Sequence, residues 1–438
     1  MHILCKEIFY LVYFNNSSRR KNFNWTFPND NPQPCTCQDT EPAKQHVPKE
    51  EMEDLQRRRA EEYRQHQIRT GKQNEVLLLA PSNTPLQYPI RGFRVLPMNK
   101  TLIPGLALHA QNRTIYEVSL RVGKGVLSVM DRNLTISSTG LEKLNDLLSR
   151  VTYTSTVYHI KTEDLSYFSF ENHEVIFPIE IRRPSVPVLY DPGKDINSQV
   201  TVLVKAFLRY KELKVLIKSI RVNYPNLKII IADDSHNPEM INGDNIEHYI
   251  MPPAQGWFAG RNLAVSQVTT KYFLWVDDDF LFLNETRIES FVKIMEAVPE
   301  LDVVGGEVVR NRFAFKLLYQ EGNSDEGGCI RRVRATHGPV PGLDRCFFVD
   351  GVVNYFMGRT DAVRRVGFDP FLKRVAHTEF FIDGLGGLLV ATCEGLQIGH
   401  QERKVTGDYN KYRFPPKSDS DQKMKHHFFK NHLKCIKY

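Results

Sequence analysis

The feature that most constrains the fold is a change of pattern at Val200, after which predicted strands and helices alternate. Residues 201–207 and 227–232 are apolar runs typical of buried strands, and the segment between them has the spacing of an amphipathic helix. A third apolar run, 272–276, follows a helix that we expect to begin near Gly260. This order predicts an α/β fold whose mostly parallel sheet carries helices on both faces. Such sheets bind ligands outside the carboxyl ends of their strands.

Three consecutive carboxylates, Asp277, Asp278 and Asp279, follow the third of these strands. Packed like charges repel, and residues i and i+2 of an extended chain face the same side. We therefore expect Asp277 and Asp279 to converge as oxygen ligands of a divalent cation, while Asp278 faces away. The alternative is an acidic turn that merely closes the strand.

Two further groups are expected at the same edge of the sheet. Asp233 and Asp234 end the second strand, where their carboxylates suit hydrogen bonding to a uracil or a ribose. Arg261 and Asn262 stand at a predicted helix start, a position that favours phosphate. A cation held by Asp277 and its neighbour would offset the charge of a pyrophosphate leaving group. Together these groups predict a nucleotide-sugar site, and no Gly-x-Gly-x-x-Gly or Walker loop competes with that interpretation.

Length and composition bound the rest of the chain. The 438 residues predict a polar stem or linker over 1–75, a smaller mostly-β domain over 76–195 and the α/β domain over 196–438. The net charge of +7 is spread without a dense basic run, which argues against nucleic acid as a partner. No stretch approaches the ~20 apolar residues of a transmembrane helix, so no anchor is predicted.

Sequons and cysteines indicate the compartment. Asn-x-Ser/Thr sequons favour a luminal or secreted protein; they occur at Asn15, Asn16, Asn24, Asn99, Asn112, Asn133 and Asn284. The seven cysteines form no Cys-x-x-Cys pair, which argues against zinc and thioredoxin-like chemistry. Six of them, without Cys5, are enough for three disulfides in an oxidising lumen.

Two long motifs resemble the β1,4-N-acetylgalactosaminyltransferases. One runs through residues 256–272 (Gly-Trp-Phe-Ala-Gly-Arg-Asn at its start) into 275–280, and the other is 374–386, which contains His-Thr-Glu-Phe-Phe-Ile-Asp-Gly. The family has a ganglioside (GM2/GD2 synthase) branch and an Sda/Cad blood-group branch. Similarity to the second branch is found in residues 151–156, 398–401 and 429–433.

The resemblance covers roughly residues 35–438 and implies a GT-A glycosyltransferase with an inverting, metal-dependent mechanism. It implies UDP-GalNAc as donor, Mn²⁺ or another divalent cation as cofactor, and galactose bearing α2,3-linked sialic acid as acceptor. Asp277 and Asp279 match the Asp-x-Asp motif, with Asp279 as the direct ligand, and His400 matches the late histidine of the metal site. Residence in the Golgi lumen as a type II membrane protein is also implied, although this sequence shows no anchor.

An inverting transfer needs a base for the acceptor hydroxyl. Glu379 and Asp383 are four residues apart, so they share a helix face if Thr378 caps that helix. We take Glu379 as the first candidate and Asp383 as the second, and we expect His377 and Asp350 to contact acceptor or sugar. The alternative role for Glu379 is compensation of a helix dipole.

Two statements remain open at this point. We predict a Cys346–Cys393 disulfide, and we expect Cys35 and Cys37 to pair with Cys329 and Cys435, plausibly across a homodimer. The competing functions are transfer to a sialylated glycolipid, as in the ganglioside branch, and carbohydrate binding without catalysis on a degenerate transferase fold.

Overall fold

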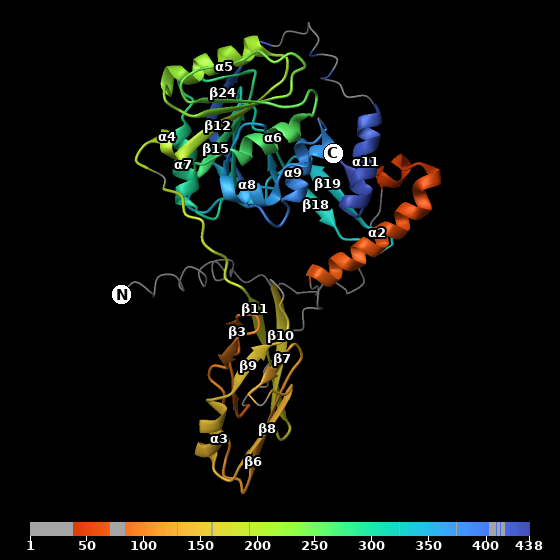
Figure 1. The fold of residues 1–438 in the computed structure, drawn as a ribbon, viewed down its shortest axis with the longest axis vertical. Helices are drawn as coiled ribbons and strands as arrows, with labels where there is room; N and C mark the ends of the chain where they lie inside the picture. Colours follow the sequence, from red (N-terminus) through yellow and green to blue (C-terminus); the bar gives the residue numbers. More distant parts are fainter. Residues whose placement is uncertain are drawn as a thin grey trace, which may run out of the picture. The chain divides into compact units, whose positions relative to one another are not determined.

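The chain is described here from a computed structural model, and its contacts divide it into two units (Figure 1). The larger unit is Met1–Tyr63 with Tyr190–Tyr438, and the smaller is Arg64–Leu189. In these described parts, no helix is long and apolar enough to cross a membrane. The residues that the structure describes are 38–70, 84–128, 130–158, 161–191, 193–323, 325–373, 375–402, 409, 412 and 417–438.

A mixed sheet forms the centre of the larger unit. Its strands are β12 (Val200–Ala206), β13 (Ile229–Asp233), β14 (Ile246–Ile250), β15 (Tyr272–Asp277), β16 (Phe280–Leu281), β17 (Val303–Val308), β20 (Gly338–Pro339), β21 (Cys346–Val349), β23 (Phe356–Arg359) and β24 (Val390–His400). The order is β14-β13-β12-β15-β23-β17-β24-β21-β20, with β16 paired to β24. The first four strands of this order are parallel, whereas β23 and β21 run against their neighbours. The predicted α/β class is confirmed, and the sheet is mixed beyond β15.

Helices cover both faces of this sheet, as predicted. They are α4 (Ile196–Gln199), α5 (Tyr210–Asn223), α6 (Trp257–Ser266), α7 (Ile288–Ala297), α8 (Thr360–Val366) and α9 (His377–Asp383). The helix α11 (Lys417–Lys430) packs instead against residues 43–46 and against the strand Leu433–Lys437. Because strand side chains alternate, Val202 and Leu274 pack with α5 and α7. Leu203 and Trp275 face the other way and pack with α6, α8 and α9 (Figure 1).

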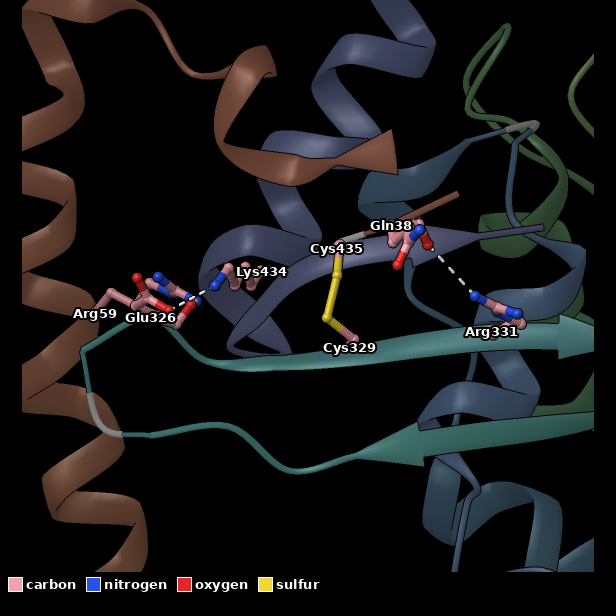
Figure 2. The surroundings of a disulfide bond; sticks show 7 residues. All are labelled: Gln38, Arg59, Glu326, Cys329, Arg331, Lys434 and Cys435. Carbon is pink, nitrogen blue, oxygen red and sulfur yellow. Dashed lines mark hydrogen bonds and ion pairs between the residues drawn. A yellow bond between two sulfur atoms is a disulfide. The ribbon is translucent and has the colours of Figure 1, made fainter. Parts of the chain in front are cut away.

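A second sheet contains the end of the sequence and a disulfide. Its order is β1-β25-β19-β18-β22, and its strands are β1 (Glu41–Pro42), β18 (Ala314–Gln320), β19 (Gly328–Val333), β22 (Gly351–Val352) and β25 (Leu433–Lys437). Cys329 and Cys435 are paired residues of β19 and β25 and form a disulfide (Figure 2). The prediction that they bond to Cys35 and Cys37 is therefore wrong, because strand pairing brings them together within one chain.

The remaining cysteines have different outcomes. Cys35 and Cys37 lie outside the described residues. The predicted Cys346–Cys393 disulfide is confirmed, and it joins directly opposite residues of β21 and β24.

The helix α2 (Lys49–Thr70) lies within the polar stem or linker predicted over 1–75, yet part of it packs into the core of the larger unit. Leu55 is 5% exposed and belongs to the core of the larger unit, together with Ala43 in the 3-10 helix η1 (Ala43–His46). The Arg59 guanidinium lies 3.8 Å from the centre of the Phe428 ring. It also donates to the Glu326 carbonyl at 2.6 Å (Figure 2). The sequence pattern does not predict this packing, because an arginine, rather than a stripe of apolar side chains, supplies much of it.

The smaller unit is mostly β, as predicted, and a buried carboxylate fixes one of its turns. Its elements are β2 (Leu86–Gln87), β3 (Phe93–Val95), β4 (Lys100–Leu102), β5 (Ala107–Leu108), β6 (Tyr116–Val122), β7 (Gly125–Leu127), β8 (Asn133–Ser138), α3 (Leu141–Leu148), β9 (Thr152–Ser155), β10 (Lys161–Phe170) and β11 (His173–Arg182). Asp164, 4% exposed, accepts hydrogen bonds from the amides of Gly123 at 2.9 Å and Lys124 at 2.7 Å. It also accepts from the Tyr153 hydroxyl at 2.9 Å, so one side chain holds the turn between β6 and β7 against β9.

We expect Asp164→Ala to destabilise the smaller unit by about 3 kcal/mol, because it leaves buried donors without partners. Calorimetric unfolding of the full chain measures this change. The control is Glu163→Ala, since Glu163 is exposed on the same strand and its removal should alter stability by less than about 0.5 kcal/mol. Equal stability of the two variants would contradict the role of Asp164.

Candidate active site

The three consecutive aspartates do not alternate as an extended strand would. β15 ends at Asp277, and Asp278 and Asp279 form the turn that leads into β16. Asp277 therefore keeps the orientation of Trp275, towards α6, whereas the next two carboxylates both face the start of α5. The expectation that Asp278 faces away is wrong, because the period-two rule ends where the strand ends.

Arg209 holds this turn. It stands just before α5, and its guanidinium binds both carboxylate oxygens of Asp278 while Nη1 lies 2.5 Å from Asp279 Oδ2. The Tyr409 ring covers the other side, with its centre 4.2 Å from Arg209 Cζ. A fork of parallel N–H donors suits two neighbouring carboxylates better than an ammonium does. Arg209 thus neutralises charges that would otherwise repel one another.

His400 is brought to Asp279 by strand pairing. His400 is the last residue of β24 and pairs with Phe280 of β16, so its Nε2 lies 3.4 Å from Asp279 Oδ2. Its Nδ1 lies against the Gln401 carbonyl, which can only accept, so Nδ1 carries a proton. Nε2 therefore donates to Asp279 when the ring is protonated, and it holds a lone pair when the ring is neutral. Burial raises the pKa of Asp279, but His400 and Arg209 outweigh this and lower that pKa to about 2.

The carboxylates of Asp233 and Asp234 are used inside the protein. Asp233 is 0% exposed and accepts from the Tyr210 hydroxyl at 2.6 Å and from His248 Nε2 at 3.1 Å. Burial alone would raise its pKa, but these bonds lower the pKa to about 2. Asp234, 1% exposed, is paired with Lys205 and accepts from the Gly256 amide. The predicted direct contact of both residues with a nucleotide is therefore corrected: they shape the loops at this edge.

Arg261 is buried under aromatic rings instead of lying at a helix start. It is the fifth residue of α6 and 1% exposed, with Trp275 and Trp257 ring centres 4.4 and 4.9 Å from its Cζ. Burial lowers its pKa to about 10 against the opposing effect of Asp277. Its Nη2 donates to Asn354 Oδ1 at 2.7 Å, and Asn354 Nδ2 lies 3.5 Å from Asp277 Oδ2. The predicted contact of Arg261 with phosphate is therefore corrected: Arg261 acts indirectly, because it holds Asp277 through Asn354.

The side chain of Asn262 is likewise committed to the backbone. Its amide accepts from the Phe368 amide at 2.8 Å and donates to the Phe368 carbonyl, which fixes the loop after α8. Both polar atoms of the Asn262 side chain thus help to hold this loop, and its contact with a nucleotide stays a prediction.

The two predicted bases face α11 and β25. Glu379 is 1% exposed, and its Oε1 accepts from the Tyr438 hydroxyl at 2.7 Å and from Lys423 Nζ at 2.8 Å. Burial would raise its pKa, but His427 and Lys423 lower the pKa to about 2. Asp383 pairs with Lys430 Nζ at 2.8 Å. The assignment of Glu379 as base is therefore corrected, because a strongly acidic and fully enclosed carboxylate is a poor proton acceptor. Asp383, the second candidate, is held by its ion pair with Lys430 of α11.

Asp350 and His377 are also away from the predicted position. Val349 pairs with Val390 at the start of β24, whereas His400 ends that strand, so Asp350 follows the opposite end. Asp350 accepts from the Leu317 amide at 2.7 Å and from a ring nitrogen of His337 at 2.8 Å. His377 donates to the Val352 carbonyl at 2.7 Å, and burial lowers its pKa to about 4. That these two residues contact acceptor or sugar stays a prediction.

Comparison with known proteins identifies the family. Residues 201–349 match the model of glycosyl transferase family 2. The chain is 44% identical over 401 residues to mouse beta-1,4 N-acetylgalactosaminyltransferase 2, with 86% of this chain and 78% of that protein covered. It is also 44% identical over 415 residues to human beta-1,4 N-acetylgalactosaminyltransferase 1, with the same coverage. The chain belongs to the β1,4 N-acetylgalactosaminyltransferases. It is thus a glycosyltransferase with the predicted GT-A domain.

Solved structures add little to this family assignment. Staphylococcus aureus TarS 1–349 in complex with UDP-GlcNAc has a TM-score of 0.36 and 14% identity, and the match covers 50% of this chain and 62% of that chain. The other TarS 1–349 structure has a TM-score of 0.35 and 14% identity, with 53% and 73% covered. Scores this low carry no argument about the transferase.

The edge formed by Asp279 and His400 fits a divalent cation in this N-acetylgalactosaminyltransferase. Asp279 Oδ2 and His400 Nε2 lie 3.4 Å apart, and a carboxylate oxygen and an imidazole nitrogen are both ligand types that divalent metal ions accept. Asp277 is close enough that its charge and that of Asp279 affect each other, and burial raises the pKa of Asp277 to about 6. In the described part of the chain, no group of three His, Cys, Asp or Glu side chains is arranged to hold a metal. The protein thus offers two adjacent ligands, whereas Asp277 faces the α6 side and its role as a further ligand stays a prediction.

Sequence reasoning missed Arg209 and the contacts of α11. Arg209 comes directly after a buried strand, and the rule that ligands gather at carboxyl strand ends could have singled it out. The contacts of Lys423 and Tyr438 with Glu379 gave no local signal, because they join residues 44 and 59 positions apart along the transferase chain.

We expect Glu379→Gln to reduce stability rather than to remove a catalytic base. Because the pKa of Glu379 falls from its ordinary value of 4.5 to about 2 on folding, the stabilisation is present above pH 4.5 and is lost as the pH falls towards 2. The loss near neutral pH should be roughly 3 kcal/mol, measured by urea unfolding. Glu300→Gln, at an exposed position, is the control. A variant that unfolds like wild type but has lost transfer would restore Glu379 as the base.

Proposed function

We propose that this enzyme transfers GalNAc from UDP-GalNAc to the 4-hydroxyl of a galactose that carries α2,3-linked sialic acid. The observation that carries the donor half of this proposal is the pair Asp279 and His400, at the strand edge where such sheets bind ligands. The names of the relatives give the sugar and the β1,4 linkage. Since the sugar of UDP-GalNAc is α-linked, a β product requires inversion at its anomeric carbon.

The proposed metal is Mn²⁺ or another divalent cation, held by Asp279 and His400. When bound, it would offset the negative charge of the diphosphate leaving group. The surrounding side chains hold the three aspartates in position. Arg209 keeps Asp278 and Asp279 together, and Arg261 holds Asp277 through Asn354 from the opposite face of the sheet.

We further propose a luminal location in the Golgi and keep a homodimer as a prediction. The two disulfides support an oxidising compartment, because such bonds are rare in the cytosol. The sequon residues Asn99, Asn112, Asn133 and Asn284 are all exposed, which glycosylation in a lumen requires. Asn15, Asn16 and Asn24 lie outside the described residues.

Asp279→Asn should weaken the Mn²⁺-dependent binding of UDP by about 100-fold, because it removes the charged ligand of the metal. Isothermal titration of UDP with and without Mn²⁺ measures the change. Asp244→Asn, at an exposed position before β14, is the matched control and should bind like wild type. An Asp279→Asn variant with unchanged dependence on Mn²⁺ would remove Asp279 from the metal site.

The acceptor is tested by supplying UDP-GalNAc and Mn²⁺ with a sialylated glycoprotein or with a sialylated ganglioside. Both relatives reach 44% identity, so the comparison does not separate the two branches. We expect the glycoprotein to be the better acceptor by at least tenfold in kcat/KM, because residues 151–156, 398–401 and 429–433 resemble the Sda/Cad branch. A preference for the ganglioside would favour the alternative branch, and binding without transfer or donor hydrolysis would indicate a non-catalytic carbohydrate-binding protein.

A further inference from the structure

Arg209 and the proposed cation need the same place beside Asp279. Arg209 Nη1 lies 2.5 Å from Asp279 Oδ2, and His400 Nε2 lies 3.4 Å from the same oxygen. A divalent cation bound to that oxygen and to His400 would sit roughly 2 Å from each ligand atom. Two positive groups so close to one oxygen repel strongly in a partly buried site.

We propose that Arg209 is an internal competitor of the metal, which occupies the cation position until the metal displaces its Nη1 from Asp279. This inference rests on the proposed function, because it assumes that the site takes a divalent cation. It goes beyond that function by giving Arg209 a role in deciding when the metal binds.

The anchoring of Arg209 makes a partial displacement physically reasonable. The guanidinium has separate contacts with Asp278, one of them Nε to Oδ2 at 3.2 Å, and the Tyr409 ring lies against it. Asp278 is 3% exposed and Asp279 16%, so the contact of Arg209 with Asp278 is the more enclosed of the two. Loss of the contact with Asp279 therefore leaves Arg209 attached to the protein and next to the site.

A displaced Nη1 also suits the donor. Guanidinium N–H groups bind phosphate oxygens well, so a diphosphate could replace the oxygen that Asp279 supplies to Arg209. Metal and nucleotide would then bind cooperatively. The metal would release Arg209 Nη1 from Asp279, and the diphosphate would give the released Nη1 a new partner. The consequence is weak occupancy by metal alone and strong occupancy when UDP is present.

The test is Mn²⁺ binding to the purified full chain, measured by electron paramagnetic resonance without and with UDP. Arg209→Lys keeps the positive charge and can still pair with Asp278, but a single ammonium cannot also span to Asp279. We expect Arg209→Lys to bind Mn²⁺ without UDP about tenfold more tightly than wild type, the order of one charge-assisted hydrogen bond. UDP should then strengthen Mn²⁺ binding less than it does in wild type.

Controls separate this inference from simple charge effects and from failure of the proposed function. Arg365→Lys, an exposed arginine paired with Asp361, should bind Mn²⁺ like wild type. Arg209→Met serves as the second variant: tighter binding in Arg209→Met but not in Arg209→Lys would mean that only net charge matters, which overturns the competition. Unchanged binding in both variants overturns it as well. A wild-type protein that binds no Mn²⁺ even with UDP would instead contradict the metal-dependent function.

Discussion

Three carboxylates in a row can share one edge of a folded protein only if their mutual repulsion is balanced, and two arginines provide that balance. Arg209 approaches from the α5 side and binds Asp278 and Asp279, while Arg261 approaches from the α6 side and holds Asp277 through Asn354. Both arginines are themselves supported by aromatic rings. The strand end, the turn and the partner strand that carries His400 all depend on this arrangement of charge.

The fully buried side chains of the site are structural, and three further side chains at the same edge are partly exposed. Asp233, Asp234 and Asn262 use their polar atoms in hydrogen bonds within the protein at this edge, so they determine where the backbone runs. Asp279, His400 and Arg209 keep side-chain exposures of 16%, 16% and 18%. This division explains how one edge can be both rigid and reactive, since buried groups with complete hydrogen bonding hold the exposed ones in place.

The sequence predicts the features that depend on local patterns. Alternation of strands and helices gives the α/β class, and the ends of the strands locate Asp279 at the edge that His400 also reaches. Features that depend on distant partners could not be predicted. Glu379 has the helical position of a plausible base, but its environment is set by α11 and Tyr438, which no local pattern announces. The predicted orientation of Asp278 is wrong because the alternation of side chains along a strand ends at Asp277, where the turn begins.

The position of β25 bears on how the chain is made. This strand lies between β1 and β19 in its sheet. Along the chain, β1 is several hundred positions from β25, and β19 is about one hundred positions from it. Cys435 of β25 is disulfide-bonded to Cys329 of β19. During synthesis the smaller unit has all of its strands long before β25 exists. Until residues 433–438 have left the ribosome, β19 of the second sheet therefore has an open edge, and Glu379 is not yet covered by Tyr438.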